Sequence, residues 1–135
     1  MAQLVRISAC ESVNVISSQL EAIIPGNIRR VFFIYGAGGS KRGGHRHHLT
    51  WNALICIQGS CRIYSTDGEN EDFYLLDNPD RCLVLTPKDW HTMDSFSSDA
   101  ILLVLSNQCY NQADYIWEPY STCFCDTIES QIVKH

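Results

Sequence analysis

Short apolar runs, each closed by a turn signal, follow one another along most of the chain. They are rich in β-branched and aromatic residues, which are common in strands. The runs lie at Arg30–Tyr35, Trp51–Ile57, Cys61–Tyr64, Asp72–Leu76, Cys82–Leu85 and Ala100–Leu105. The helical period is nearly absent, apart from a short turn expected within 17–24 and a weakly amphipathic tail at 126–133. This pattern predicts an all-β sandwich or barrel.

A glycine-rich stretch, Gly36–Gly44, follows the first run and contains Lys41, so a phosphate-binding loop has to be considered. The last glycine of the dinucleotide fingerprint is missing, and Gly44 stands where a P-loop needs its lysine. No helix is expected after it, although both motifs place the phosphate on a helix N-terminus. We therefore interpret the stretch as a flexible connection whose glycines allow substrate to approach the backbone.

Length and charge limit the possible functions. With 135 residues, the chain has room for one domain, expected to span 1–135. A net charge of -5 argues against nucleic-acid binding, which needs a basic face. The basic pairs Arg29-Arg30 and Lys41-Arg42 are short, and such pairs usually lie on a solvated edge. Lys41-Arg42 is the better functional candidate because it lies just before a cluster of histidines.

The cysteines and the apolar runs indicate the compartment. Seven cysteines are an odd number, and two of them, Cys56 and Cys82, sit inside apolar runs, where a free thiol behaves as a small hydrophobe. Cys123 and Cys125 have neither redox-pair nor zinc-knuckle spacing. No secretory signal is visible, and no apolar run reaches the ~20 residues of a membrane helix. We expect a protein of the reducing cytoplasm that is not inserted in a membrane.

Three histidines are crowded into His45, His47 and His48, and a fourth, His91, lies in an apolar context further on. Side chains alternate along a strand, so His45 and His47 share a face while Arg46 and His48 point the other way. Two imidazoles that converge inside a barrel can bind metal or move protons near neutral pH. We favour such a function over surface histidines in a polar loop.

The motifs around these histidines resemble those of the cupins. Gly43-Gly44-His45-Arg46-His47, a strand and then Gly59 look like the first cupin motif, and Pro87–His91 looks like the second. The resemblance implies a single cupin domain, that is, a double-stranded β-helix or jelly-roll barrel. Metal-binding cupins carry a glutamate where this chain has Trp51, which weakens the case for a metal site; three imidazoles alone can still hold a metal.

A closer similarity is to the WxcM-like sugar-nucleotide 3,4-ketoisomerases, and it runs from about residue 29 to 117. It is carried by Arg30–Tyr35, Arg42–His47, Gly59–Arg62, Pro87–His91, Phe96–Asp99 and Tyr110–Ile116. The family implies conversion of dTDP-4-keto-6-deoxy-glucose to a 3-keto sugar in deoxyamino-sugar and surface-polysaccharide biosynthesis, without metal or cofactor, by a homodimer. The chain departs from the family at Glu11–Val15 and in having Asn52 where a glutamine is usual.

Moving a carbonyl by one carbon needs a base and a donor to the developing oxyanion. The proton-transfer base is expected to be His47, with His45 as its partner or second relay. Tyr35 is a candidate donor to a sugar oxygen, against the alternative of a half-buried barrel tyrosine.

Four further residues are expected to bind substrate. Arg42, and Arg62 if it faces inward, would pair with the diphosphate. His91 would line the far pocket wall and influence which face of C4 is reprotonated, leaving the galacto or gluco product open. Trp51 is a candidate to stack on the base, although the tryptophans are more often core or rim residues.

Two alternatives remain open. A metal-dependent oxygenase would use His45, His47 and His91 as a three-histidine site and would contain stoichiometric transition metal. A non-catalytic cupin would bind the dTDP-sugar without exchanging its protons with solvent.

Overall fold

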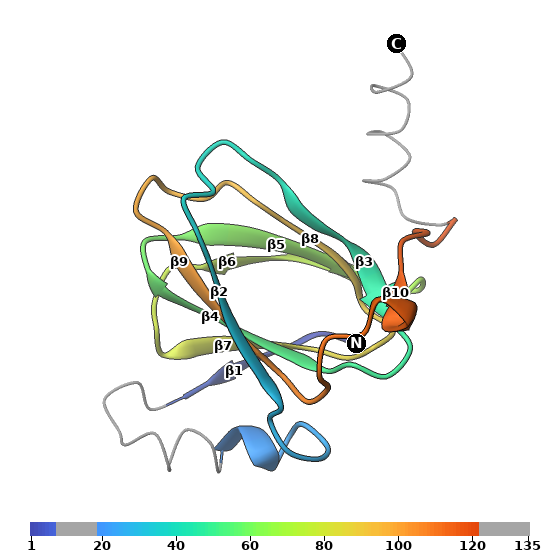
Figure 1. Ribbon diagram of the computed structural model, residues 1–135. Coiled ribbons are helices and arrows are strands. Elements are labelled where there is room, and N and C mark those ends of the chain that lie inside the picture. Colours follow the sequence, from blue (N-terminus) through green and yellow to red (C-terminus); the bar gives the residue numbers. More distant parts are fainter. Residues whose placement is uncertain (8–18, 122–135) are drawn as a thin grey trace.

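Ten strands form two antiparallel sheets that face each other in the computed structural model, which describes residues 1–7 and 19–121 (Figure 1). Sheet A has the order β1-β7-β4-β9-β2, and sheet B the order β10-β3-β8-β5-β6. The strands are β1 Gln3–Arg6, β2 Arg30–Tyr35, β3 Arg42–His47, β4 Asn52–Gln58, β5 Cys61–Thr66, β6 Glu71–Leu76, β7 Arg81–Leu85, β8 Trp90–Asp94, β9 Ile101–Ser106 and β10 Tyr115–Ile116. A 3₁₀ turn, η1 (Gln112–Asp114), precedes β10.

The predicted all-β fold is confirmed, and each of the six apolar runs is a strand. The pattern of apolar runs did not indicate β1, β3, β8 or β10. Strand β8 was missed because it carries polar residues such as His91 and Thr92, which are buried against its neighbours instead of alternating with exposed positions. The two sheets match the sandwich expected of a jelly roll, and no closed ring of strands is formed within 1–7 and 19–121.

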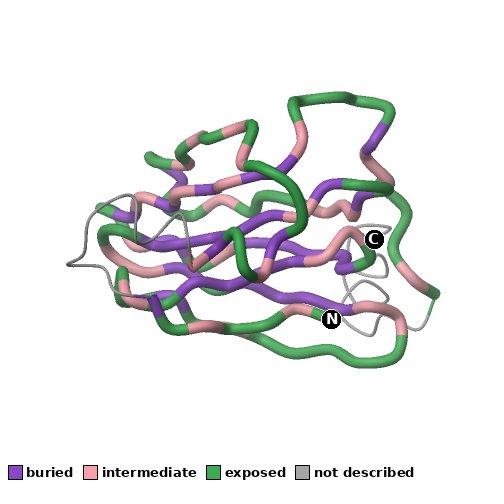
Figure 2. Tube along the Cα trace, turned by 90° about the horizontal axis from the view of Figure 1, so that it is seen from below, coloured by how far each residue is buried: buried purple, intermediate pink, exposed green. Residues whose placement is uncertain are grey.

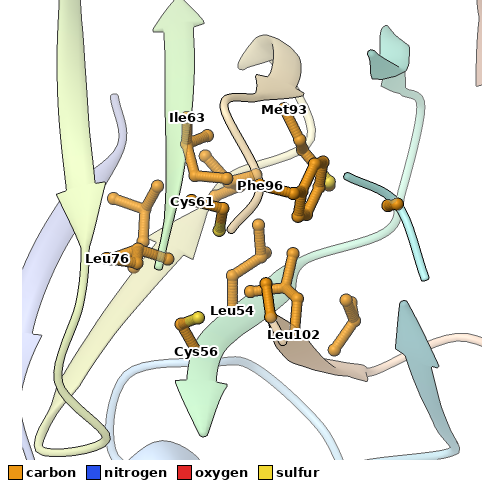
Figure 3. Packing of buried hydrophobic residues seen from close by; sticks show 13 residues of the cluster. Leu54, Cys56, Cys61, Ile63, Leu76, Met93, Phe96 and Leu102 are labelled. Carbon is orange, nitrogen blue, oxygen red and sulfur yellow. The ribbon is translucent and has the colours of Figure 1, made fainter. Parts of the chain in front are cut away.

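The register of sheet A arranges its inward residues in three rows across β2, β9 and β4. Asn52 lies opposite Ser106, Leu54 opposite Val104, and Cys56 opposite Leu102. Strand β2 adds Arg30, Phe32 and Ile34 to the same three rows. The interior therefore changes from polar to apolar along the strands, and Figure 3 shows the apolar end, where Leu102 and Cys56 pack with residues of sheet B.

The outer face of sheet A is also covered. A helical turn at 19–24, in which the Ile24 amide donates to the Leu20 carbonyl over 2.8 Å, packs Leu20 and Ile24 against Ala53 and Ile55. Strand β4 is thus buried on both faces, which explains its continuous apolar run. Figure 2 shows that the buried stretches of the chain, in purple, run through the middle of the molecule. The short turn expected within 17–24 is confirmed for its described part.

The glycine-rich stretch is not a loop throughout, because Gly43 and Gly44 lie within β3. Both have positive φ, and the register shifts between Gly43 and His45. A Cβ on Gly43 would lie 2.9 Å from the His91 carbonyl oxygen, so a glycine here lets β3 approach the backbone of β8. This corrects our interpretation of the stretch as a connection throughout: Gly43 lies in a strand and permits the close approach of β8. A strand follows the stretch, which excludes the nucleotide loop.

Four cysteines can be described, and all are free thiols. Cys56, Cys61 and Cys82 are buried, as predicted for small hydrophobes, whereas Cys109 is exposed. Cys10, Cys123 and Cys125 lie outside the described residues, as do Glu11–Val15 and the predicted amphipathic tail at 126–133. Within the described parts of the chain, no helix is long and apolar enough to span a membrane.

Candidate active site

Three imidazoles meet on the inner face of sheet B. The bulge in β3 places His45 opposite His91 of β8, and alternation brings His47 to the same face. The ring centroid of His45 lies 4.8 Å from that of His91 and 5.0 Å from that of His47. Strand β10 adds Tyr115 opposite His47, with the two ring centroids 4.6 Å apart. The predicted convergence of His45, His47 and His91 is confirmed as a placement.

His47 is oriented by a carboxylate far away in the sequence. Its Nδ1 lies 3.0 Å from Asp114 Oδ2, and both side chains are buried. Asp114 is itself held by the Leu49 amide, which donates to Oδ1 over 2.8 Å, and by the Thr50 hydroxyl, which donates to Oδ2. Because a carboxylate only accepts, the His47 proton sits on Nδ1 and leaves Nε2 unprotonated.

The hydrogen bonds continue on the other side of the His47 ring. The Ser106 hydroxyl donates to Asn52 Oδ1, so the Asn52 amide nitrogen is turned toward His47 Nε2, 3.4 Å away. His91 is fixed in a similar way, with Nδ1 3.1 Å from the carbonyl oxygen of Asp89. Its proton also lies on Nδ1, which leaves Nε2 of His91 as an acceptor.

Burial keeps all three imidazoles neutral. Desolvation, with the neighbouring His91 and His47 adding to it, lowers the pKa of His45 to about 3. Desolvation lowers the pKa of His91 to about 4. The pKa of His47 is lowered too, chiefly by desolvation, while the hydrogen bond and charge of Asp114 oppose that shift. The site therefore presents unprotonated nitrogens near neutral pH.

The three rings open onto a cavity of about 160 Å³ between the sheets. From sheet A it is lined by Arg30, Phe32 and Ile34 of β2, and by Asn52. The guanidinium carbon of Arg30 lies 4.2 Å from the Phe32 ring centroid, and Nη1 donates to the Tyr115 hydroxyl over 3.2 Å. A cation is thus held at the wall opposite the imidazoles.

This polar end, with its oriented imidazoles inside a two-sheet fold, can be compared with known proteins. The family model described as FdtA, WxcM-like, C-terminal matches residues 1–125. The chain belongs to the FdtA family. It is 39% identical over 94 residues, 69% of this chain and 68% of the relative, to the TDP-4-oxo-6-deoxy-alpha-D-glucose-3,4-oxoisomerase of Aneurinibacillus thermoaerophilus.

Solved structures agree with the FdtA assignment. WlaRA, a TDP-fucose-3,4-ketoisomerase from Campylobacter jejuni, has a TM-score of 0.77 and 30% identity, over 87% of this chain and 89% of that one. A mutant of the 3,4-ketoisomerase QdtA from Thermoanaerobacterium thermosaccharolyticum, in complex with TDP-4-keto-6-deoxyglucose, has a TM-score of 0.73 and 25% identity, over 99% and 95% of the two chains. The predicted ketoisomerase resemblance is confirmed.

In this FdtA family member, two aromatic residues predicted to contact substrate lie elsewhere. Tyr35 is 73% exposed and faces away from the cavity, because Phe32 and Ile34 take the inward positions of β2. Trp51 packs on the outer face of sheet A, with the cluster around Leu20 and Ile24. Neither residue lines the cavity of the single chain. The local sequence does not show which face of β2 is inward, nor that sheet A has a second core.

Both predicted diphosphate arginines are also outside the cavity. Arg62 faces outward, where Nε and Nη2 each donate to the Asp94 carboxylate over 2.9 Å. Arg42 is exposed at the start of β3, and its Nε lies 3.4 Å from Ser40 Oγ. The cation that does line the cavity is Arg30, from the basic pair that we had interpreted as a solvated edge.

Sequence reasoning also missed the partners of the histidines. Asp114 and Tyr115 fall within a motif that carried the family resemblance, yet nothing local marks Asp114 as a partner of His47. Asn52 was noted only as a departure from the family. The available signal was the alternation of β4, which places Asn52 on the same face as Leu54.

The residues that the structure describes include no group of three His, Cys, Asp or Glu side chains arranged to hold a metal ion. The ring centroids of His47 and His91 are 6.3 Å apart, with 23° between the ring planes. The geometry thus lends the three-histidine oxygenase no support, and metal analysis remains its test.

Proposed function

We propose that this protein is an isomerase that converts dTDP-4-keto-6-deoxy-glucose into a dTDP-3-keto-6-deoxy-hexose, with His47 as the proton-transfer base. One observation carries the proposal: Asp114 fixes the proton of His47 on Nδ1, while the other edge of the ring lines a cavity between the sheets. The family assignment and the named activities of its relatives support the same reaction.

The first half of the reaction removes a proton beside the ketone. Nε2 of His47 takes the proton from C3, the C–H electron pair becomes the C3=C4 double bond, and the C4 carbonyl oxygen becomes an oxyanion. The Asp114 carboxylate stabilises the imidazolium that forms. Arg30 and the Tyr115 hydroxyl face the same cavity and supply positive charge and a hydrogen-bond donor for the oxyanion.

The second half returns a proton to C4. The oxyanion is protonated, the hydroxyl on C3 loses its proton, and the C=C electron pair takes a proton at C4 as the C3 carbonyl forms. No proton or electron is gained overall, so the reaction needs no external oxidant or reductant. His45 and His91, both neutral and adjacent, are the groups through which these protons pass. His91, on the wall beyond His45, is placed to influence the face of C4 that is reprotonated.

We also propose a homodimer. Val31, Phe33 and Tyr35 are 55%, 52% and 73% exposed on the outward face of β2, which is the edge strand of sheet A. Exposed apolar rows of this kind are typical of interfaces. The mass in solution, measured by light scattering, should be that of two chains, and a monomer at micromolar concentration would contradict this part of the proposal. Free buried thiols are consistent with a reducing cytoplasm.

The test is one incubation with dTDP-4-keto-6-deoxy-glucose in heavy water, followed by NMR. A 3-keto product with deuterium at C4, and deuterium at C3 of recovered substrate, is expected. Binding without either change would identify a non-catalytic sugar-nucleotide-binding protein. Stoichiometric transition metal in the purified protein, together with chelator-sensitive activity, would favour the oxygenase.

A further inference from the structure

Strand β10 carries much of the site but is held by little regular structure. It is the edge strand of sheet B, and its two residues pair with His47 and Arg46 of β3. Asp114, immediately before the strand, orients His47, and the Tyr115 ring lies against the same imidazole. A ladder of two residues is shorter than most strands and offers few hydrogen bonds. The position of β10 therefore depends on other contacts.

The chain that follows β10 first contacts the histidine side of sheet B. The ring centroid of Trp117 lies 5.3 Å from that of His45. The Trp117 ring is also stacked on Tyr115, with centroids 5.5 Å apart and 20° between the ring planes. Trp117 is nevertheless 59% exposed, so this contact lies at the rim of the site and secures the chain on one side only.

A second contact lies on the opposite face of β3 and involves Arg46. This side chain points away from the cavity, because it alternates with His45 and His47 along the strand. Its guanidinium carbon lies 4.2 Å from the centroid of the Tyr120 ring. Nη1 donates to the Tyr120 hydroxyl over 3.3 Å, and Nε donates to the Glu118 carbonyl oxygen over 3.4 Å. One side chain of β3 thus makes three contacts with the chain that follows β10.

Tyr120 has anchors besides Arg46. Its hydroxyl donates to the Lys88 carbonyl oxygen over 2.8 Å. Its ring packs on Tyr64 and Trp90, which are buried on the outer face of sheet B. Lys88 lies just before β8, the strand that carries the third histidine of the site. Tyr120 therefore joins the chain after β10 to both strands that bear the imidazoles.

We propose that Arg46 and Tyr120 form a clamp that fixes β10 against β3 and makes Arg46 a positioning residue for the reaction. The clamp keeps Asp114 and Tyr115 in contact with His47, although Arg46 does not line the cavity. The kinetic consequence rests on the proposed function, whereas the clamp follows from the contacts on the outer face of sheet B. A guanidinium suits this place because it is planar, so it can stack on a ring and donate hydrogen bonds in its own plane.

Amide hydrogen exchange, measured by NMR, tests the clamp without reference to catalysis. The His48 amide donates to the Asp114 carbonyl oxygen over 3.0 Å, and the Leu49 amide donates to Asp114 Oδ1 over 2.8 Å. Arg46→Met keeps the aliphatic bulk but removes the guanidinium. Both amides should then exchange about tenfold faster, because β10 separates from β3 more often. The Ser97 amide, which is hydrogen-bonded outside the site, should exchange at the wild-type rate.

Kinetics test the link to the reaction. Arg46→Met should lower kcat about five- to tenfold, because small misplacements of reacting groups are costly. Arg46→Lys should lower it less, since an ammonium keeps the charge over the ring but loses the planar fork. In an Asp114→Asn background, the effect of Arg46→Met should be much smaller, because a residue that acts through Asp114 has little left to position. A contribution to global stability alone would give the same factor in both backgrounds.

A matched pair of aromatic variants provides the control. Tyr120→Leu and Phe73→Leu each replace a ring that lies beside an arginine on the outer face of sheet B. For Phe73 that arginine is Arg62, with its guanidinium carbon 4.8 Å from the ring centroid. Tyr120→Leu should reproduce the faster exchange and lower kcat of Arg46→Met, whereas Phe73→Leu should leave both at wild-type values. Circular dichroism of each variant verifies the fold.

The outcomes separate this inference from the proposed function. Faster exchange in Arg46→Met and Tyr120→Leu, with a kcat loss that nearly vanishes in the Asp114→Asn background, supports the inference. Wild-type exchange in both variants would overturn the clamp, whether or not the protein isomerises substrate. Faster exchange with wild-type kcat would overturn the positioning role of Arg46. Faster exchange in a protein that forms no 3-keto product would support the clamp and contradict the proposed function.

Discussion

The two ends of the space between the sheets are built from the same strands but by different means. At one end Cys56 pairs with Leu102, and the surrounding side chains are apolar and almost fully buried. At the other end, four residues along the same strands, Asn52 pairs with Ser106 and is hydrogen-bonded to it. From there a continuous hydrogen-bonded chain passes through His47 to Asp114 and Thr50.

The difference shows what each end contributes. Apolar packing depends on volume and tolerates small shifts, whereas each buried polar group needs a partner in the correct direction. The apolar end therefore supplies most of the folding stability. The polar end contributes less to stability, but it holds the His47 imidazole in one orientation. Strand β9 contains both, with Leu102 at one end and Ser106 at the other, so paired substitutions on it can test this division of roles.

The largest effect is expected for Asp114→Asn. An amide holds His47 less well and no longer stabilises an imidazolium, so kcat should fall about 10²–10³-fold. Asp114 raises the pKa of His47, so the acid limb of kcat/KM against pH should move to lower pH in the variant. A purely structural role would lower activity without moving that limb, and this outcome would refute the orienting role of Asp114.

At the apolar end, Leu102→Ala should reduce the free energy of unfolding by about 2–5 kcal/mol, because it leaves a cavity in a fully buried cluster. Denaturant unfolding measures the loss. The kcat of the folded fraction at low temperature should stay near the wild-type value. A large kcat defect in the folded protein would mean that the two ends are not separable.

At low pH, the folding stability should decrease because of the buried histidines of the polar end. The pKa of His91 is about 4 in the folded protein, against a value near 6.5 for a histidine in the unfolded chain. Between these pH values, unfolding is therefore accompanied by proton uptake. Stability should therefore decrease as pH falls from about 6.5 to about 4. The slope of the free energy of unfolding against pH gives the number of protons taken up on unfolding. At pH 5 this number should be smaller by about one in His91→Asn than in the wild type. The exposed His48→Asn serves as control, and equal slopes in the two variants would contradict the prediction.

The smallest change is expected for Ser106→Ala. It removes the hydroxyl that fixes the Asn52 amide, so the free energy of unfolding should decrease by about 1 kcal/mol. The kcat should fall several-fold, far less than for Asp114→Asn, because Asn52 only supports the orientation of His47. Stopped-flow or steady-state assays measure kcat for Ser106→Ala and for Leu102→Ala, so that the two ends of β9 can be compared. A kcat equal to wild type would place Ser106 outside the hydrogen-bonded chain that supports catalysis.

Much of this layout could be predicted from sequence because it depends on local alternation. The apolar runs gave the strands, and the period of two put His45 and His47 on one face. Which residues lie opposite one another was not predictable, because register depends on pairing between strands distant in sequence. The row of Arg30, Ser106 and Asn52 is a consequence of that register, which is why Arg30 was passed over in favour of Arg42.

Asp114 shows a second limit. It lies 67 residues from His47, in a 3₁₀ turn, and only the pairing of β10 with β3 brings it to the imidazole. Tyr35 and Trp51 lie outside the cavity for a related reason, since the face on which each side chain lies depends on what covers the sheet. The histidines could be recognised from the local sequence, whereas the residues that hydrogen-bond to them are brought close only by the tertiary structure.

The most direct test of the central claim is deuterium exchange at C3 of bound substrate, compared between the wild type and His47→Asn. Both proteins should bind dTDP with equal affinity, which shows that the site is intact. The account predicts rapid exchange at C3 in heavy water for the wild type and none above background for the variant. Exchange that persists at the wild-type rate in His47→Asn would show that another group removes the proton, and would contradict the account.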